Sequence, residues 1–148
     1  MNGEPLRNKT IITTRPPGRE YTLTDPLGRY GAEVYNLPTI KIQYAGLNEK
    51  IRTLLNKIHE YDWLLFTSPN GVRAFLELMQ QTQHTTRLPS HLRVGVYGEK
   101  AARLLRTWDI IPGFVDNGPT SHSFFRRVLY NILNRRQNVL VALGALAD

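Results

Sequence analysis

The 148-residue sequence contains no cysteine, which excludes disulfide bonds and thiolate chemistry. Its longest apolar runs, Trp63–Phe66 and Val139–Leu143, are far too short to span a bilayer. The stretch from Met1 to Thr10 is polar and mixed in charge, with no secretory apolar segment. From these absences we expect a cytoplasmic protein that does not act at a membrane.

The motifs of several common enzyme classes are missing as well. There is no P-loop, no Gly-x-Gly-x-x-Gly after a strand and no Gly-x-Ser-x-Gly. The histidines are scattered without metal-ligand spacing, so we expect no metal site; they are His59, His84, His91 and His122.

The formal net charge of +7 favours acidic partners through long-range attraction. The alternative is an ordinary solvated basic surface. The basic residues are spread along the chain, with doublets only at Arg126-Arg127 and Arg135-Arg136. No basic run alternates with stacking aromatics, so we expect no nucleic-acid partner.

The most informative stretch runs from Tyr61 to Phe75. A short apolar run, Trp63–Phe66, ends in small polar residues and a glycine, and an amphipathic helical pattern follows. This order is typical of a strand whose carboxyl end meets a helix N-terminus. Open α/β sheets bind ligands at that edge, and a helix N-terminus offers free N–H groups to an anion.

Similar strand and helix patterns alternate along the whole chain. This alternation predicts an α/β fold with a parallel sheet and flanking helices. We expect the second helix to be capped by Asn48, and the first to be broken or shortened by Pro26 and to end at Gly31. Trp63 and Trp108 are both expected in the core. The predicted strands are 9–14, 32–37, 61–67, 93–97, 114–115 and 139–143, and the predicted helices are 19–30, 48–59, 72–81, 99–107 and 120–134.

Several motifs, taken in order, resemble those of the uroporphyrinogen-III synthase family. They include Thr13-Thr14-Arg15-Pro16, Leu37-Pro38-Thr39-Ile40, Phe66-Thr67-Ser68-Pro69-Asn70-Gly71-Val72 and Val96-Tyr97-Gly98-Glu99-Lys100. The family has two α/β lobes joined by a two-stranded linker. The resemblance implies that 1–37 open the first lobe, 38–43 form a linker strand and 44–148 form most of the second lobe. One lobe is then incomplete, as in an amino-terminal portion or a truncated member.

The resemblance also implies an activity. Family members are cyclising carbon–oxygen lyases that convert hydroxymethylbilane to uroporphyrinogen III, inverting the last pyrrole ring and releasing water. They need no cofactor, and their substrate is a polycarboxylate, a linear tetrapyrrole. The alternative is a truncated, non-catalytic homologue that binds acidic ligands weakly or not at all. A flavodoxin-like module of unrelated function is a more distant alternative. We expect a monomer, or association through the incomplete lobe.

The resemblance suggests substrate-binding residues around the Thr-Ser-Pro motif. Ser68 matches the family's binding serine, although a plain helix N-cap is the alternative. Thr67 stands beside it, and Asn70 and Gly71 either touch substrate or only shape the turn. Arg15 is a candidate for a substrate carboxylate, with a surface position as the alternative.

The second predicted binding segment begins at Gly98, where the backbone is expected to approach substrate. Ala101 stands where the family has a threonine, and Leu143-Gly144 stands where it has Arg-Gly. No tyrosine of this chain matches by motif the tyrosine proposed to assist hydroxyl loss, so the catalytic residue is left unassigned.

Overall fold

The structure is a computed structural model and describes residues 3–131 and 136–143. The chain divides into two compact units, Met1–Tyr44 (unit 1) and Ala45–Asp148 (unit 2). Residues 37–48 are assigned to neither helix nor strand. The linker strand expected over 38–43 therefore has no pairing in the part of the chain that the structure describes, and it stays a prediction.

Unit 1 is a single β–α–β element. Strand β1 (Thr10–Thr13) pairs in parallel with β2 (Glu33–Asn36), and α1 (Tyr21–Arg29) connects them. Gly31 ends the helical segment with φ +90°, and a Cβ there would lie 2.8 Å from the Glu4 Cβ. Only glycine fits both the positive φ and this close approach, so the predicted stop at Gly31 is confirmed.

Helix α1 runs without a break through Pro26. It is shorter than the predicted 19–30, but it is not interrupted. Pro26 has no N–H to donate to the carbonyl one turn earlier, and its ring crowds that carbonyl. Of the two outcomes that we expected at Pro26, the helix is therefore shortened and not broken.

Unit 2 is a four-stranded parallel sheet in the order β5-β4-β3-β6. Central β3 pairs with β4 and β6 in a register that places Trp63 opposite Arg93 and Val139. All four of its residues are buried, as expected for a strand covered on both faces. The strands are β3 (Trp63–Phe66), β4 (Arg93–Tyr97), β5 (Phe114–Asp116) and β6 (Val139–Ala142).

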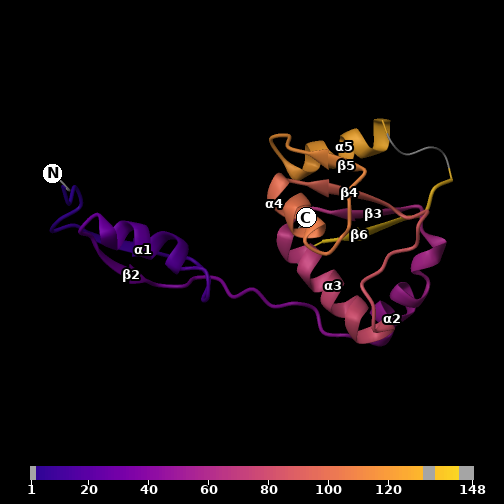
Figure 1. Cartoon of the computed structure of the whole chain (residues 1–148), viewed down its shortest axis with the longest axis horizontal. Helices are drawn as coiled ribbons and strands as arrows, with labels where there is room; N and C mark the ends of the chain where they lie inside the picture. Colours follow the sequence, from indigo (N-terminus) through magenta and orange to yellow (C-terminus); the bar gives the residue numbers. More distant parts are fainter. Residues whose placement is uncertain (1–2, 132–135, 144–148) are drawn as a thin grey trace. The chain divides into compact units, whose positions relative to one another are not determined.

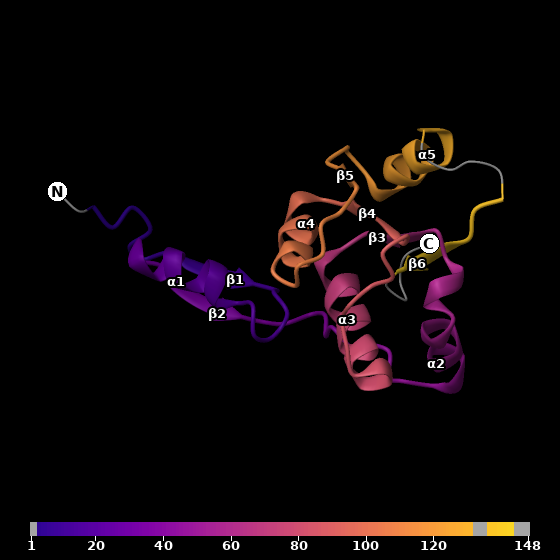
Figure 2. The ribbon, with the colours of Figure 1, turned by 45° about the vertical axis from the view of Figure 1, so that its right-hand side comes forward.

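The helices of unit 2 cover both faces of this sheet, with α5 on one side and α2 and α3 on the other (Figures 1 and 2). Leu64 and Phe66 pack in the larger hydrophobic core with residues of α2, α3 and α4. Trp63 and Leu65 point to the other face, where Phe124 of α5 packs. The helices are α2 (Glu49–Asn56), the 3-10 turn η1 (Ile58–Glu60), α3 (Pro69–Gln83), α4 (Glu99–Arg106) and α5 (Ser121–Asn131).

The predicted boundaries that fall on described residues hold within three residues. One of the larger shifts is at α3, which begins at Pro69 instead of 72, because Ser68 caps it and proline suits the first helical position. Trp63 is buried as predicted, but Trp108 is 47% exposed, so its placement in the core was wrong. The predicted end of the last helix, at 134, lies outside the described residues.

Candidate functional site at the carboxyl edge of the unit 2 sheet

The carboxyl ends of β3, β4, β5 and β6 meet at one edge, because all four strands are parallel. Three of these strands run directly into helices α3, α4 and α5. Phe66 pairs with Val96, so the turns after β3 and β4 begin at nearly the same level of neighbouring strands. The candidate residues Thr67, Ser68 and Gly98 are thereby brought to one edge.

Ser68 is the N-cap residue of α3. Its Oγ accepts a hydrogen bond from the Gly71 N–H at 3.1 Å. A hydroxyl that accepts this bond keeps its own proton for donation. The cap and a contact to an acceptor ligand are therefore compatible at Ser68. Thr67 precedes the cap, and Asn70 lies in the first turn of α3.

Gly71 fits tightly against the end of the neighbouring strand. A Cβ on Gly71 would lie 3.1 Å from the Ala142 carbonyl oxygen, which ends β6. Because the obstacle is backbone, it yields less readily than a side chain would. Gly71 therefore shapes the junction between the α3 turn and β6. Leu143 follows at this edge, and Gly144 lies outside the described residues.

Gly98 opens α4 with φ +88°. Its N–H donates to the Asp116 carbonyl oxygen at 2.8 Å, so this group joins β4 to β5 and is not offered to a ligand. Apart from its two chain neighbours, no described residue has an atom within 4 Å of a Cβ built there, so the described residues leave the Cα side of the turn open. Ala101, where the resemblance led us to expect a threonine, is fully buried in the first turn of α4.

The contacts of Asp116 and Gly118 after β5 were not predicted from the sequence, whereas a cap of the following helix at Thr120 or Ser121 was expected. The Asp116 carboxylate accepts from the Gly118 N–H at 2.9 Å and from Arg127 Nη1 at 2.7 Å. The Tyr97 hydroxyl donates to the Gly118 carbonyl at 3.0 Å. Thr120 then caps α5 through its Oγ, which accepts from the Ser123 N–H at 3.1 Å. The Asp-Asn-Gly-Pro order was the available signal, because an aspartate side chain commonly accepts a hydrogen bond from the backbone N–H two residues on.

Cationic side chains near the edge give it a positive character. Arg73 and Lys100 lie within the first five residues of α3 and α4. Glu99 is paired with Arg106 at 2.8 Å, which neutralises the one acidic residue in the first turn of α4. Positive groups together with helix N-termini favour an anionic ligand.

Arg15, the remaining candidate, belongs to unit 1. It follows β1, its side chain is exposed, and Nη1 donates to the Thr22 hydroxyl at 3.1 Å. This is the surface position that we gave as the alternative. A contact between Arg15 and a ligand stays a prediction.

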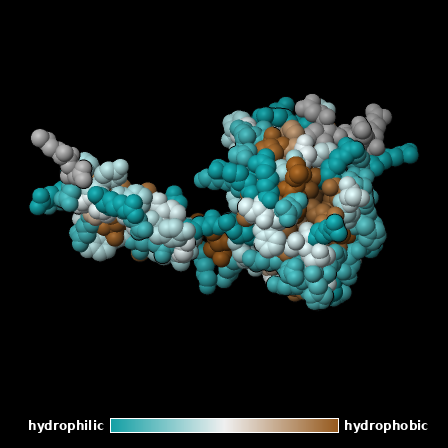
Figure 3. Space-filling model, in the orientation of Figure 1, coloured by the Kyte–Doolittle hydropathy of each residue, from teal (hydrophilic) through white to brown (hydrophobic). Residues whose placement is uncertain are grey.

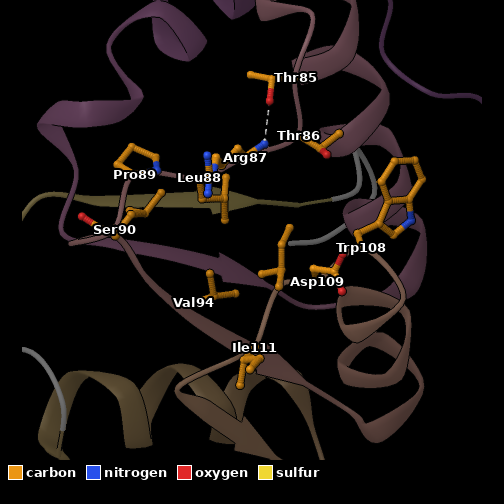
Figure 4. A pocket seen from close by; sticks show the side chains of 12 residues that line it. Thr85, Thr86, Arg87, Leu88, Pro89, Ser90, Val94, Trp108, Asp109 and Ile111 are labelled. Atoms are coloured by element: carbon orange, nitrogen blue, oxygen red, sulfur yellow. Dashed lines mark hydrogen bonds between the residues drawn. The ribbon is translucent and has the colours of Figure 1, made fainter.

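A cavity lies at the opposite edge of the sheet. It has a volume of about 690 Å³ and is lined mainly by residues that precede β4 and β5, among them Leu88, Ser90 and Trp108 (Figure 4). None of the predicted binding residues lines it. This cavity at the amino ends of the strands is therefore separate from the candidate site, which lies at their carboxyl ends, where open α/β sheets bind ligands.

Two further features bear on the kind of protein. Within the described ranges, no cluster of histidine, aspartate or glutamate side chains could hold a metal ion. No described helix is long and apolar enough to cross a membrane. Figure 3 shows hydrophilic side chains over much of the visible face of each unit, with hydrophobic side chains between them on unit 2.

The fold and this edge define an α/β protein in which a row of strand-to-helix turns lines one side of a parallel sheet. The comparisons with known proteins give the particular family. A sequence profile described as "Uroporphyrinogen-III synthase HemD" matches residues 22–148. The chain therefore belongs to the uroporphyrinogen-III synthase family, and the resemblance inferred from the motifs is confirmed.

Relatives with corresponding names are similar to most of this chain. The porphyrin biosynthesis protein HemD of Ruminiclostridium josui is 31% identical over 111 residues, which cover 75% of this chain and 22% of that protein. The uroporphyrinogen-III synthase of Synechococcus elongatus is 33% identical over 110 residues, covering 71% and 39%. The putative uroporphyrinogen-III synthase of Methanocaldococcus jannaschii is 28% identical over 123 residues, which cover 80% of this chain and 46% of that protein. The chain spans less than half of each relative.

Solved structures confirm the fold. A mutant uroporphyrinogen III synthase from Thermus thermophilus superposes with a TM-score of 0.55 at 22% identity, covering 85% of this chain and 53% of the other. The wild-type enzyme gives a TM-score of 0.53 at 19% identity, covering 92% and 52%. The predicted α/β class with parallel sheets and flanking helices is therefore correct.

Proposed function

We propose that this chain provides part of the substrate-holding edge of a uroporphyrinogen-III synthase, which closes hydroxymethylbilane to uroporphyrinogen III. The observation that carries the proposal is the turn from Phe66 to Val72, where a capped helix N-terminus stands at the carboxyl edge of the sheet. It lies in a chain whose family is established over residues 22–148. Family membership supports a cyclising lyase, and the proposal extends that activity to this chain.

The reaction needs little from the protein beyond placement of the substrate. The C–O bond of the hydroxymethyl group breaks, the hydroxide leaves as water after protonation, and a resonance-stabilised cation remains on the ring that carried this group. The last ring, at the other end of the chain, attacks this cation through its substituted α-carbon and forms the new C–C bond. The older bond from that carbon to the bridging carbon then breaks and re-forms at the free α-carbon of the same ring, which inverts the ring, and loss of a proton from this second carbon restores the pyrrole. Holding the ends of the chain in the right geometry is a catalytic contribution in itself. Turns with backbone N–H and hydroxyl groups suit this task.

The substrate carries acetate and propionate groups on every ring, and the residues of the edge can hold such groups. The Ser68 hydroxyl keeps a proton to donate, and the first turns of α3 and α4 present their N-termini. Arg73 and Lys100 add positive charge. Carboxylates are favoured by all of these features.

The test is incubation of the purified 148-residue chain with freshly generated hydroxymethylbilane, followed by oxidation and separation of the isomers. An excess of isomer III over the spontaneously formed isomer I is the expected result. In a matched comparison, Ser68→Asp should reduce that excess, whereas Ser90→Ala, which removes an exposed hydroxyl at the opposite sheet edge, should not. Isomer I alone would contradict activity of this chain and favour the non-catalytic homologue.

A further inference from the structure

One face of α5 carries a polar hollow that no binding role yet explains. Ser123 and Tyr130 each lie three and four residues from the adjacent pair Arg126 and Arg127, so all four share one helix face, and they line a hollow of about 310 Å³. The opposite face of the helix carries Phe124 and Val128, which are buried against the sheet. The hollow thus presents two guanidinium groups and two hydroxyls, with no acidic side chain among its lining residues.

The buried carboxylate of Asp116 holds the Arg127 side chain in place. Its Nη1 donates to Asp116 Oδ1 at 2.7 Å, and the Asp116 side chain is only 2% exposed, whereas that of Arg127 is 45% exposed. A Cβ on Gly118 would overlap the guanidinium, so the absence of a side chain there lets Arg127 lie close against the turn. A guanidinium has five donors in a rigid fork. The buried carboxylate fixes the orientation of this fork while part of it stays at the surface.

Arg126 supplies charge that the network does not neutralise. Asp116 offsets one of the two adjacent guanidinium groups, and Arg126 forms no ion pair with any described residue. The hollow also adjoins the candidate edge, because Asp116 ends β5 and Ser123 lies in the first turn of α5. A carboxylate suits such a cluster, because its two oxygens lie in one plane and can accept two parallel hydrogen bonds from a guanidinium group.

We infer that this face of α5 is a carboxylate-binding subsite that takes an acetate or propionate side chain of the tetrapyrrole. Arg126 and Arg127 bind the carboxylate oxygens, and Asp116 is a positioning residue that orients Arg127. The inference rests on the proposed function for the identity of the ligand, but binding of a carboxylate to this face can be measured without turnover.

The experiment is an NMR titration of the ¹⁵N-labelled 148-residue chain with tricarballylate, a small tricarboxylate. The Gly118 and Ser123 amides and the Arg127 side-chain N–H signals should shift together and saturate. Arg126→Gln should weaken binding about tenfold, as expected for loss of one charged hydrogen bond. Arg103→Gln, which removes the same charge from an exposed position on α4, should leave binding within about twofold, since it removes only long-range attraction.

Arg127→Lys is the second variant, since it keeps a charge near buried Asp116 while losing the fork. It should fold and bind more weakly than wild type. Equal weakening by Arg126→Gln and Arg103→Gln, or no shift at Gly118 and Ser123, would overturn the subsite. Failure of the proposed function looks different: tricarballylate binds on α5 as described, but the chain forms no isomer III. Isomer III formed by Arg126→Gln with an unchanged KM would overturn the subsite and leave the proposed function standing.

Discussion

The Gly71 backbone lies so close to the Ala142 carbonyl oxygen that a Cβ on Gly71 would be 3.1 Å from it. This contact joins the first turn of α3 to the end of β6, two segments about seventy residues apart in sequence. The turn that carries Ser68 is thus held by β6, which follows α5 in the chain and is far from the turn in sequence. The candidate site depends on the completed sheet, and not on the β3–α3 segment alone.

Gly71→Ala should destabilise unit 2 by about 1–2 kcal/mol. Alanine is the better helix former by about 1 kcal/mol, but the close backbone contact costs more than this gain, as overpacking typically does. Thermal unfolding followed by the fluorescence of buried Trp63 measures the change. Gly46→Ala is the control, because nothing lies within 4 Å of its Cβ. An equal or higher stability of Gly71→Ala would show that β6 moves aside freely.

Replacing Ser68 should separate its capping role from a binding role. Ser68→Ala should lower the free energy of unfolding by about 1 kcal/mol, because the Gly71 N–H loses its acceptor. Ser68→Asp should keep the stability, since aspartate caps as well as serine. It should nevertheless weaken the binding of a polycarboxylate by adding a negative charge. Denaturant unfolding and calorimetric titration give the two quantities. Unchanged binding by Ser68→Asp would argue that Ser68 is only a cap.

Gly98→Ala should lower the free energy of unfolding by about 1–3 kcal/mol, although no described side chain or backbone group would touch the added Cβ. The cost comes from φ +88°, a conformation that residues with a Cβ rarely adopt. Gly113→Ala is the matched control: its nearest neighbour is 3.9 Å away, and its φ is not in the positive range. Urea unfolding of both variants tests the claim. Similar stabilities for the two variants would mean that the β4–α4 turn relaxes without strain.

Tyr35 should titrate at a higher pH than an ordinary tyrosine. Its hydroxyl donates to Glu33 Oε1 at 2.6 Å, and this hydrogen bond, followed by the negative charge of Glu33, raises the pKa of Tyr35. The stabilisation is fully present below the unfolded-state pKa and is lost as the pH rises through the folded-state pKa. NMR titration of Tyr35 in Glu33→Gln should give a lower pKa, and Glu49→Gln should give no change. Equal values for wild type and Glu33→Gln would contradict the assignment.

The sequence predicts the local elements well where a residue acts on its near neighbours. Asn48 was expected to cap the second helix, and its side chain accepts from the Ile51 N–H at 2.9 Å. Gly31 was expected to end the first helix, and it does so with a positive φ. Caps and stops of this kind depend on atoms within a few residues, which a single sequence contains.

Predictions that depend on distant partners fared less well. Trp108 has a large apolar side chain and was expected in the core, but it is partly exposed and lines the cavity at the amino edge of the sheet. The second strand-helix turn of interest, at Asp116 and Gly118, was missed because its partners Tyr97 and Arg127 come from a neighbouring strand and from the following helix. The local sequence pattern places each of these residues in its own strand or helix and does not show which residues of other elements it contacts.

The sequence by itself determined the family and the α/β class, because the order of the motifs and the alternation of strand and helix patterns can be recognised without knowing any tertiary contact. It also determined which residues stand at the carboxyl ends of the strands. Only the tertiary structure decided the strand order β5-β4-β3-β6, which sets Phe66 beside Val96 and Ala142 and seats Arg127 on a buried Asp116. The reason is physical: strand order follows from pairing and from burial of both sheet faces, and these join residues that no local pattern connects.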